Sequence, residues 1–461
     1  MTSFASITIN GWRQFDAVSI DFHPRLTIIT GSNGAGKSTI LNICAQHFAP
    51  ARPFLATPKR RKGGGFLFDP GLLAKSETAG SYTTFFDDEI EQEEEEEEEE
   101  DQIDPSLSDG FDAYKAATSR GRPGNFIPIG DFRYDNGAVG TIGFHENQSH
   151  SYGLQITNQQ QVLGVPISSH RALASYQPVA GLSFQIISLA AAYQNYMSEY
   201  VTRSNGGQSQ FSPMYRMKET LIAMAAFGEG NSHFERIDEL AAAFTDFGKV
   251  LRKVLPKEIG FQRLSVRAPD IILKTRSGEF IVDAGSGGIT AVIEITWQLF
   301  LYSRIQPSFS ATLDEPENHL HPSMQRSILA NLVDAFPQVQ FVVATHSPFI
   351  VSAVENSRVY ALRYTGKLGP NGFPDHKTRR VRSVELDQVK KAGSASEILE
   401  EVLGVRVSIP EWASRQLNNI IADFEGVEVT TETLKQLRAK LAEAGFSDYY
   451  PEALANLVRH K

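Results

Sequence analysis

The sequence Gly31-Ser32-Asn33-Gly34-Ala35-Gly36-Lys37-Ser38, followed by Thr39, comes directly after the apolar run 26–29. This order predicts a glycine-rich turn that joins a buried strand to the start of a helix. In such a turn backbone N–H groups curl around an anion, the lysine reaches the β- and γ-phosphates of a nucleotide, and the serine hydroxyl binds magnesium. We therefore expect residues 31–39 to bind a nucleotide, with Ser38 as a magnesium ligand and Lys37 as a catalytic residue.

Two acids close a second apolar stretch, 309–313, at Asp314 and Glu315. At the end of a strand both carboxylates become free, so that the first can bind magnesium and the second can polarise the water that attacks a γ-phosphate. The alternative is an ordinary acidic turn, which the phosphate-binding loop in the same chain disfavours. Residues 318–322 then lead into a stretch of helical periodicity, which Pro322 is well placed to open.

A third apolar stretch, 340–345, ends at His346. A lone histidine is more often a structural residue than a catalytic one. Here, however, its strand follows the acid-bearing strand by one helix, so the two strands should be parallel neighbours with their carboxyl ends at a nucleotide crevice. The position predicts that His346 senses the γ-phosphate.

The segment Ser286-Gly287-Gly288 stands just before the apolar helix predicted at 291–302. A serine and two glycines at a helix N-terminus form a further anion site. One chain does not need two such sites for one γ-phosphate. We therefore expect residues 286–288 to act in trans, on a nucleotide held by a second subunit.

These four elements, in this order, resemble the ABC-type ATPases found in RecF, SMC and OLD proteins. The resemblance covers roughly residues 3–50 and 260–365. It identifies residues 31–38 with the Walker A motif, residues 286–288 with the signature motif, Asp314 and Glu315 with the Walker B pair, residues 318–321 with the D-loop, and His346 with the switch histidine. It implies an α/β head with a mixed sheet, ATP and Mg²⁺ as cofactors, ATP hydrolysis with Glu315 and His346 as catalytic residues, and a head-to-tail homodimer around two ATPs.

The sequence departs from this pattern in places. Gly285 and Ile289 stand where many cassette proteins have leucine and glutamine. The side chains that flank the expected contact between residues 286–288 and the nucleotide of a second subunit therefore differ from those of the family. Gln177 is the candidate for the metal-binding glutamine of the Q-loop, and the alternative is an ordinary loop glutamine. Residues 180–256 show helical patterns without sustained heptads, so we expect a short helical insertion instead of long coiled-coil arms.

The net charge of −10 comes from the segment 87–101, which carries 13 acids. Without this segment the 44 basic residues of the chain nearly balance the remaining acids. Like charges at this density repel one another, which predicts a solvated, disordered acidic insertion over 86–110. The basic stretch 59–62 is interpreted as a flexible loop or, alternatively, as a DNA-backbone contact with which the acidic run competes.

Composition restricts the class of protein. A chain of 461 residues, 41% of them apolar, can bury a large core. Its one cysteine, Cys44, excludes an internal disulfide and suits a reducing compartment. No apolar run approaches the roughly 18 residues of a membrane helix, and the first residues lack a signal pattern. We therefore expect a cytoplasmic protein without a membrane partner, which also disfavours a transporter ATPase.

The residues after His346 lack the Asp-x-Asp pair that the Toprim nuclease of OLD proteins needs. Helical patterns at 396–403, 412–424 and 434–441 predict a small helical domain. The pattern at 395–403 resembles the tail of the ATPase subunits of Septu-type and retron antiphage systems. This resemblance implies a separate HNH-type nuclease as partner and DNA as target. The alternative is a RecF-like repair ATPase that binds DNA in an ATP-dependent way.

These expectations together divide the chain into six parts. They are the Walker A part of the ATPase head at 1–85, the acidic insertion at 86–110, the remainder of the N-terminal lobe at 111–179, the helical insertion at 180–256, the second part of the head at 257–365, and the helical C-terminal domain at 366–461.

Overall fold

The computed structural model describes residues 2–50, 52–60, 66–75, 82–84, 126–145, 150–171, 176–181, 188–204, 206–230, 232–233, 235–365, 380–387, 391, 393, 395–402, 411–424, 430–450 and 453–454. The chain forms two compact units, Met1–Gly404 and Val405–Lys461. The expected acidic insertion, 86–110, lies outside the described residues, as do the basic residues Arg61 and Lys62.

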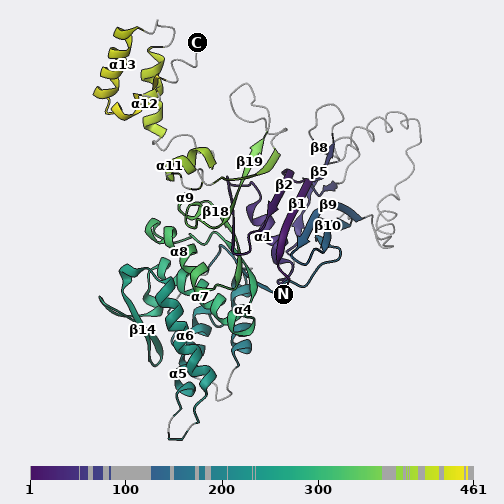
Figure 1. The fold of residues 1–461 in the computed structure, drawn as a ribbon, viewed down its shortest axis with the longest axis vertical. Coiled ribbons are helices and arrows are strands. Elements are labelled where there is room, and N and C mark those ends of the chain that lie inside the picture. The colour runs from purple at the N-terminus through teal and green to yellow at the C-terminus, as the bar shows by residue number, and fades with distance from the viewer. Residues whose placement is uncertain are drawn as a thin grey trace, which may run out of the picture. The chain divides into compact units, whose positions relative to one another are not determined.

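A mixed sheet of eleven described strands runs through the first unit (Figure 1). Five neighbouring strands are parallel, in the order β13 (Gly164–Ile167), β17 (Phe309–Asp314), β18 (Val339–Thr345), β3 (Leu26–Gly31) and β19 (Arg358–Thr365). The sheet continues beyond β19 with β20 (Arg380–Glu385), β2 (Phe15–Asp21), β1 (Phe4–Trp12), β9 (Phe126–Tyr134), β10 (Val139–His145) and β12 (Gln155–Ile156). The predicted α/β fold with a mixed sheet is confirmed, and β17 and β18 are parallel neighbours as expected.

Side chains that alternate along β3 and β18 enter two different hydrophobic cores. Ile28 and Val343 belong to one core, while Ile29 and Val342 belong to the other. Because the strands are buried on both faces, their residues are mostly apolar, and the charged residues of the site stand beyond their carboxyl ends. Among the helices that line these cores are α1 (Lys37–Ala45) in the second, and α7 (Gly287–Ile305) and α8 (Pro322–Ala335) in the first.

A helical lobe adjoins α7, and its helices lie side by side in Figure 1. Phe247 and Trp297 tie the lobe to α7 through an edge-on contact with ring centroids 4.8 Å apart. The lobe consists of α4 (Leu189–Ser204), α5 (Pro213–Gly228) and α6 (Asp238–Val254), together with a small antiparallel sheet of β14 (Phe261–Arg267), β15 (Asp270–Thr275) and β16 (Gly278–Ile281). The three helices fall within the stretch 180–256, for which the sequence predicts helices.

Short elements connect the larger ones. Lys59 lies on the β-hairpin strand β5 and forms an ion pair with Asp69 at 3.2 Å, so the basic stretch 59–62 begins in a strand and not in a free loop. The short elements are β4 (Phe54–Leu55), β5 (Thr57–Arg60), β6 (Phe66–Asp69), β7 (Leu73–Lys75), β8 (Tyr82–Thr84), β11 (Ser151–Tyr152), α9 (Pro348–Val351), α11 (Ala395–Glu397), the 3₁₀ turns η1 (Lys257–Ile259) and η2 (Val282–Ala284), and the π-turn η3 (Ile398–Val402).

The second unit is helical, with α12 (Glu411–Ala422), α13 (Thr431–Glu443) and the 3₁₀ turn η4 (Ser447–Tyr449) around a small apolar core of its own. Because β20 belongs to the central sheet, the first unit continues to Gly404, and the boundary expected at 366 lies inside it. No described helix combines the length and the apolar character needed to cross a membrane.

Candidate functional site

The loop between β3 and α1 has the backbone of a phosphate-binding turn. Gly34 and Gly36 have φ angles of +76° and +95°, which side chains other than glycine rarely adopt. A Cβ at Gly36 would lie 2.3 Å from the Phe15 ring. Gly36 is also the N-cap of α1 and has no side chain with which to cap the helix. The amides of the first turn therefore remain suited to an anion.

Lys37 is buried and lies across this loop. Its Nζ donates to the Gly31 carbonyl at 3.0 Å and to the Ser32 carbonyl at 3.2 Å, and lies 3.3 Å from His346 Nδ1. Burial lowers the pKa of Lys37 to about 8, although Glu315 and Asp314 oppose the shift. The ammonium is therefore still the main form at neutral pH, where it can neutralise a phosphate.

Ser38, in the first turn of α1, meets Asp314 at the end of β17. The Ser38 hydroxyl donates to Asp314 Oδ1 at 3.1 Å, and burial raises the pKa of Asp314. A nucleotide-bound magnesium ion uses one or two protein oxygens and completes its shell with phosphate oxygens and water. One hydroxyl beside one carboxylate fits such an ion.

Glu315 and His346 form the next contact. Glu315 Oε1 lies 3.2 Å from His346 Nε2, and Oε2 accepts a hydrogen bond from Asn318 Nδ2 at 3.1 Å. Burial, and then the charge of Lys37, lower the pKa of His346, so the ring is neutral at pH 7. Since the Lys37 ammonium can only donate, Nδ1 accepts, and we assign the proton to Nε2, which donates to Glu315. The carboxylate is thus oriented from two sides.

Glu317 is a site residue that the motifs did not reveal. One of its buried carboxylate oxygens accepts from the Thr345 hydroxyl at 2.5 Å and from the backbone N–H groups of His346 at 2.8 Å and Ser347 at 3.1 Å. Burial raises the pKa of Glu317, while these hydrogen bonds lower it. The contacts fix the turn that presents His346. The sequence feature that could have revealed Glu317 is that it is the third acid within residues 314–317.

Arg171 was also missed. Its guanidinium donates to the main-chain carbonyls of Glu315 at 3.2 Å and Asn318 at 3.3 Å. The sequence offers only a basic residue four positions after a short apolar strand, and such a residue is too common to single out.

Residues 286–288 start α7, with Ser286 as its N-cap. A Cβ at Gly288 would lie 2.9 Å from the carbonyl oxygen of His319, and a Cβ at Gly287 would lie 3.6 Å from the His319 side chain. Within one chain this helix start therefore packs on the turn that follows Glu315, whereas the atoms crowding Gly31, Gly34 and Gly36 come from other segments. Action in trans stays a prediction.

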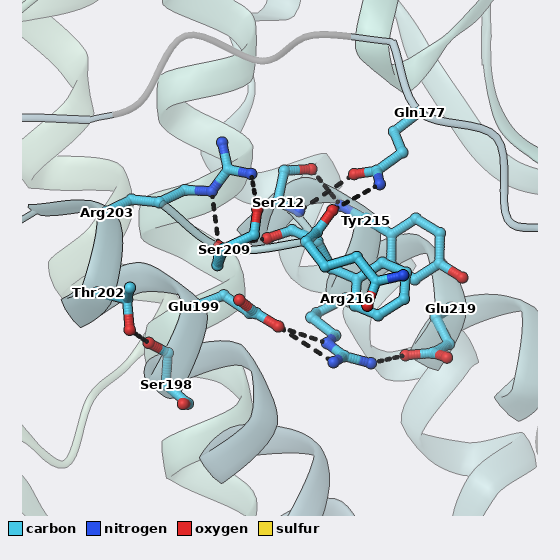
Figure 2. A network of polar contacts seen from close by, with 12 residues as sticks. Gln177, Ser198, Glu199, Thr202, Arg203, Ser209, Ser212, Tyr215, Arg216 and Glu219 are labelled. Atoms are coloured by element: carbon cyan, nitrogen blue, oxygen red, sulfur yellow. Dashed lines mark hydrogen bonds and ion pairs between the residues drawn. The ribbon is translucent and has the colours of Figure 1, made fainter. Parts of the chain in front are cut away.

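Gln177, the Q-loop candidate, has its contacts in the helical lobe (Figure 2). Its side chain donates to the Gln210 carbonyl and accepts from the Ser212 N–H, both at 3.1 Å, and its own carbonyl accepts from Lys218 Nζ at 2.7 Å. These contacts serve the start of α5. They do not join Gln177 to Ser38 or Asp314, and so they give its expected metal role no support.

A cavity of about 360 Å³ opens beside Asp314. Its walls come from α1, residues 49, 50, 52 and 53, the ends of β13 and β17, and α4. The walls mix apolar side chains with polar ones, among them Arg52, Ser168 and Asp314.

Two family models match parts of this chain. Residues 6–100 match a family model described as an AAA domain, and residues 312–352 match one described as "AAA domain, putative AbiEii toxin, Type IV TA system". The first match contains the phosphate loop, and the second contains Asp314, Glu315 and His346. Together they cover less than half of the chain.

Three curated proteins are similar over parts of their length. Septu protein PtuA of Bacillus thuringiensis is 26% identical over 43% of this chain and 47% of its own length. The Retron Vc95 probable ATPase of Vibrio cholerae serotype O1 biovar El Tor is 38% identical over 10% of this chain and 9% of its own. DNA repair protein RAD50 of Dictyostelium discoideum is 36% identical over 17% of this chain and 6% of its own. This chain thus matches less than half of the length of each.

Among solved structures, the SMC head domain from Thermotoga maritima aligns with 83% of this chain and 99% of that chain, at 13% identity and a TM-score of 0.39. The sequence matches confirm the resemblance to AAA/ABC-type ATPase heads and, distantly, to Septu PtuA and retron ATPases.

Proposed function

We propose that this protein is an ATP-binding and ATP-hydrolysing subunit of an antiphage defence complex, in which it dimerises around ATP and controls a partner HNH-type nuclease that acts on DNA. The observation that carries the ATPase part is the continuous chain of contacts from Lys37 through His346 to Glu315, with Ser38 and Asp314 beside it. Support for the defence role is the similarity to Septu protein PtuA over 43% of the chain.

The residues of the site divide the chemistry among them. Lys37 exchanges its backbone carbonyl partners for the β- and γ-phosphates, and Ser38 and Asp314 would hold magnesium, which would neutralise phosphate charge. Glu315 orients and deprotonates the attacking water, while His346 donates from Nε2 and keeps the carboxylate in place. Residues 286–288 of a second subunit complete the site, so that hydrolysis depends on dimer closure.

The test compares the wild type with Lys37→Met and Glu315→Gln, purified and in the native host. We expect the wild type to hydrolyse ATP, Lys37→Met to lose ATP binding, and Glu315→Gln to bind ATP and accumulate as a dimer. A tagged Glu315→Gln protein should recover a nuclease whose activity depends on the trapped ATP. Wild-type turnover in Glu315→Gln would contradict the assigned role of this residue.

A RecF-like repair ATPase is the second candidate, and the similarity to RAD50 over 17% of the chain favours it. It predicts DNA-stimulated ATP hydrolysis, and recovery of DNA with recombination proteins and no nuclease of the HNH type in the same pull-down.

A further inference from the structure

The chain segment that leaves β13 runs along the turn that carries Glu315. β13 pairs in parallel with β17, and the last pair joins Ile167 to Leu313. Both strands therefore end at the same edge of the sheet. There Asn318 Nδ2 donates to the Ser169 carbonyl at 3.4 Å, so the two segments are in contact beyond the paired strands.

Arg171 adds two hydrogen bonds to this contact. Its Nη2 donates to the carbonyl of Glu315 and its Nη1 donates to the carbonyl of Asn318, at 3.2 and 3.3 Å. The planar guanidinium thus spans the turn from its first residue to its fourth. An ammonium group, which concentrates its donors at one point, cannot reproduce this fork.

The turn that Arg171 spans is strained. Glu315, its first residue, has a φ of +46°, and His319, the residue just after it, has a φ of +70°, both in the left-handed region that side chains other than glycine rarely adopt. Such a conformation persists only where its surroundings hold it. The Asn318 amide within the turn is also the donor that orients Glu315 Oε2.

Arg171 is itself half-buried among charged groups. Burial lowers its pKa, and the hydroxyls of Tyr200 and Tyr196 and the carboxylates of Glu294 and Glu317 oppose that shift. Glu294 lies on α7, seven residues after the helix begins, and burial raises its pKa to about 7 although Arg171 lowers it. Arg171 therefore contacts the turn of Glu315 and interacts electrostatically with the helix that begins at residues 286–288.

We propose that Arg171 is a positioning residue for ATP hydrolysis, which holds the turn 315–318 so that the Glu315 carboxylate faces the attacking water. The inference rests on the proposed ATPase function. Since Arg171 bonds backbone carbonyls of the turn and no phosphate contact is required of it, its loss should lower turnover and leave the affinity for ATP nearly unchanged. Displacement of a catalytic group by about 1 Å can cost of the order of 100-fold in rate.

The experiment compares Arg171→Met and Arg171→Lys with the wild type in three measurements: binding of a fluorescent ATP analogue, kcat and KM for ATP, and thermal unfolding. The matched control is Arg216→Met, which also removes a guanidinium from a network in the same unit. Arg216 pairs with Glu199 and Glu219, both at 3.0 Å (Figure 2). Both of its partners lie on helices of the helical lobe.

We expect kcat to fall at least tenfold in Arg171→Met, with ATP affinity within about twofold of the wild type, and Arg171→Lys to lose turnover as well because it lacks the fork. Arg216→Met should retain both values. If Arg171→Met does not fold, the kcat and the ATP affinity of Arg171→Lys test the proposal instead. Wild-type kcat in a folded Arg171 variant overturns this inference alone, as does equal loss of ATP affinity and turnover. A wild-type protein that binds ATP without hydrolysing it overturns the proposed function and this inference with it.

Discussion

At the scale of single residues, the protonation of Lys37 should differ between the protein without ATP and the protein with ATP bound. Its Nζ is occupied by two backbone carbonyls, and its pKa of about 8 reflects burial that nearby carboxylates only partly offset. Phosphate oxygens next to the ammonium favour its charged form and raise this pKa. Binding of ATP must therefore be linked to protonation of Lys37.

This linkage predicts the pH dependence of ATP affinity. Below pH 8 the Lys37 amine is already charged, so its titration should not change the affinity for ATP. Above pH 8 the binding of ATP must take up a proton, and the affinity for ATP should fall by up to about tenfold per pH unit. Titration calorimetry at pH 7 and pH 9, in buffers of different ionisation enthalpy, measures the proton uptake. Proton uptake at pH 9 that does not exceed the uptake at pH 7 would contradict the assignment to Lys37.

Glu317 gives a second prediction at this scale. Glu317→Gln keeps the side-chain volume but removes the charge that accepts one hydroxyl and two backbone donors. We expect a lower free energy of unfolding, by about 1–3 kcal/mol, since charge-assisted hydrogen bonds are lost. Turnover should fall as well, because the turn that presents His346 loosens. Chemical denaturation and steady-state kinetics measure the two effects. Glu355→Gln, at an exposed position, is the control.

At the scale of elements, the N-terminus of α7 packs tightly against the turn after β17. Gly288 lies so close to His319 that no side chain fits between them. The helix start that should face a partner subunit is therefore placed by the same turn that presents Glu315. A shift of either element must displace the other.

Gly288→Ala tests this contact, because its Cβ would lie 2.9 Å from the His319 carbonyl. We expect the variant to bind ATP as a single subunit but to lose at least tenfold in turnover and to dimerise poorly with ATP. Light scattering in the Glu315→Gln background measures the dimer. Gly248→Ala in α6, where a Cβ meets nothing within 4 Å, is the control and should dimerise normally. Normal dimerisation of Gly288→Ala would refute the coupling.

At the scale of the whole molecule, the two compact units have separate apolar cores. All the site residues named above belong to the first unit. Leu437 is fully buried in the second unit, and Leu332 is fully buried in the first. Truncation of a buried leucine costs about 2–5 kcal/mol in the core where it lies.

We therefore expect Leu437→Ala to destabilise the second unit and to leave ATP affinity unchanged, and Leu332→Ala to destabilise the first. Hydrogen exchange with and without ATP distinguishes destabilisation of the first unit from destabilisation of the second, because a ligand stabilises only the unit that binds it. Faster exchange in α8 of Leu437→Ala would show that the units do not unfold separately.

The sequence predicted what is local and missed what depends on distant contacts. Strand ends that carry the phosphate loop, the paired acids and His346 are readable because apolar runs end there in polar residues. Arg171 and Glu317 act through hydrogen bonds to segments that no periodicity brings together. Gln177 was expected near the metal as the candidate for the Q-loop glutamine, yet its amide satisfies the backbone at residues 210 and 212. A loop position alone does not say which side chain reaches a site.

The strand order has a consequence for synthesis of the chain on the ribosome. β3, which leads into the phosphate loop, lies between β18 and β19, and both of these strands are translated some 300 residues later. For most of translation the nascent chain carries this apolar strand without its partners. Such unpaired strands attract chaperones or aggregate. Polypeptides released before residue 365 would lack a stable nucleotide loop, so an incomplete copy could not compete for ATP with the finished protein.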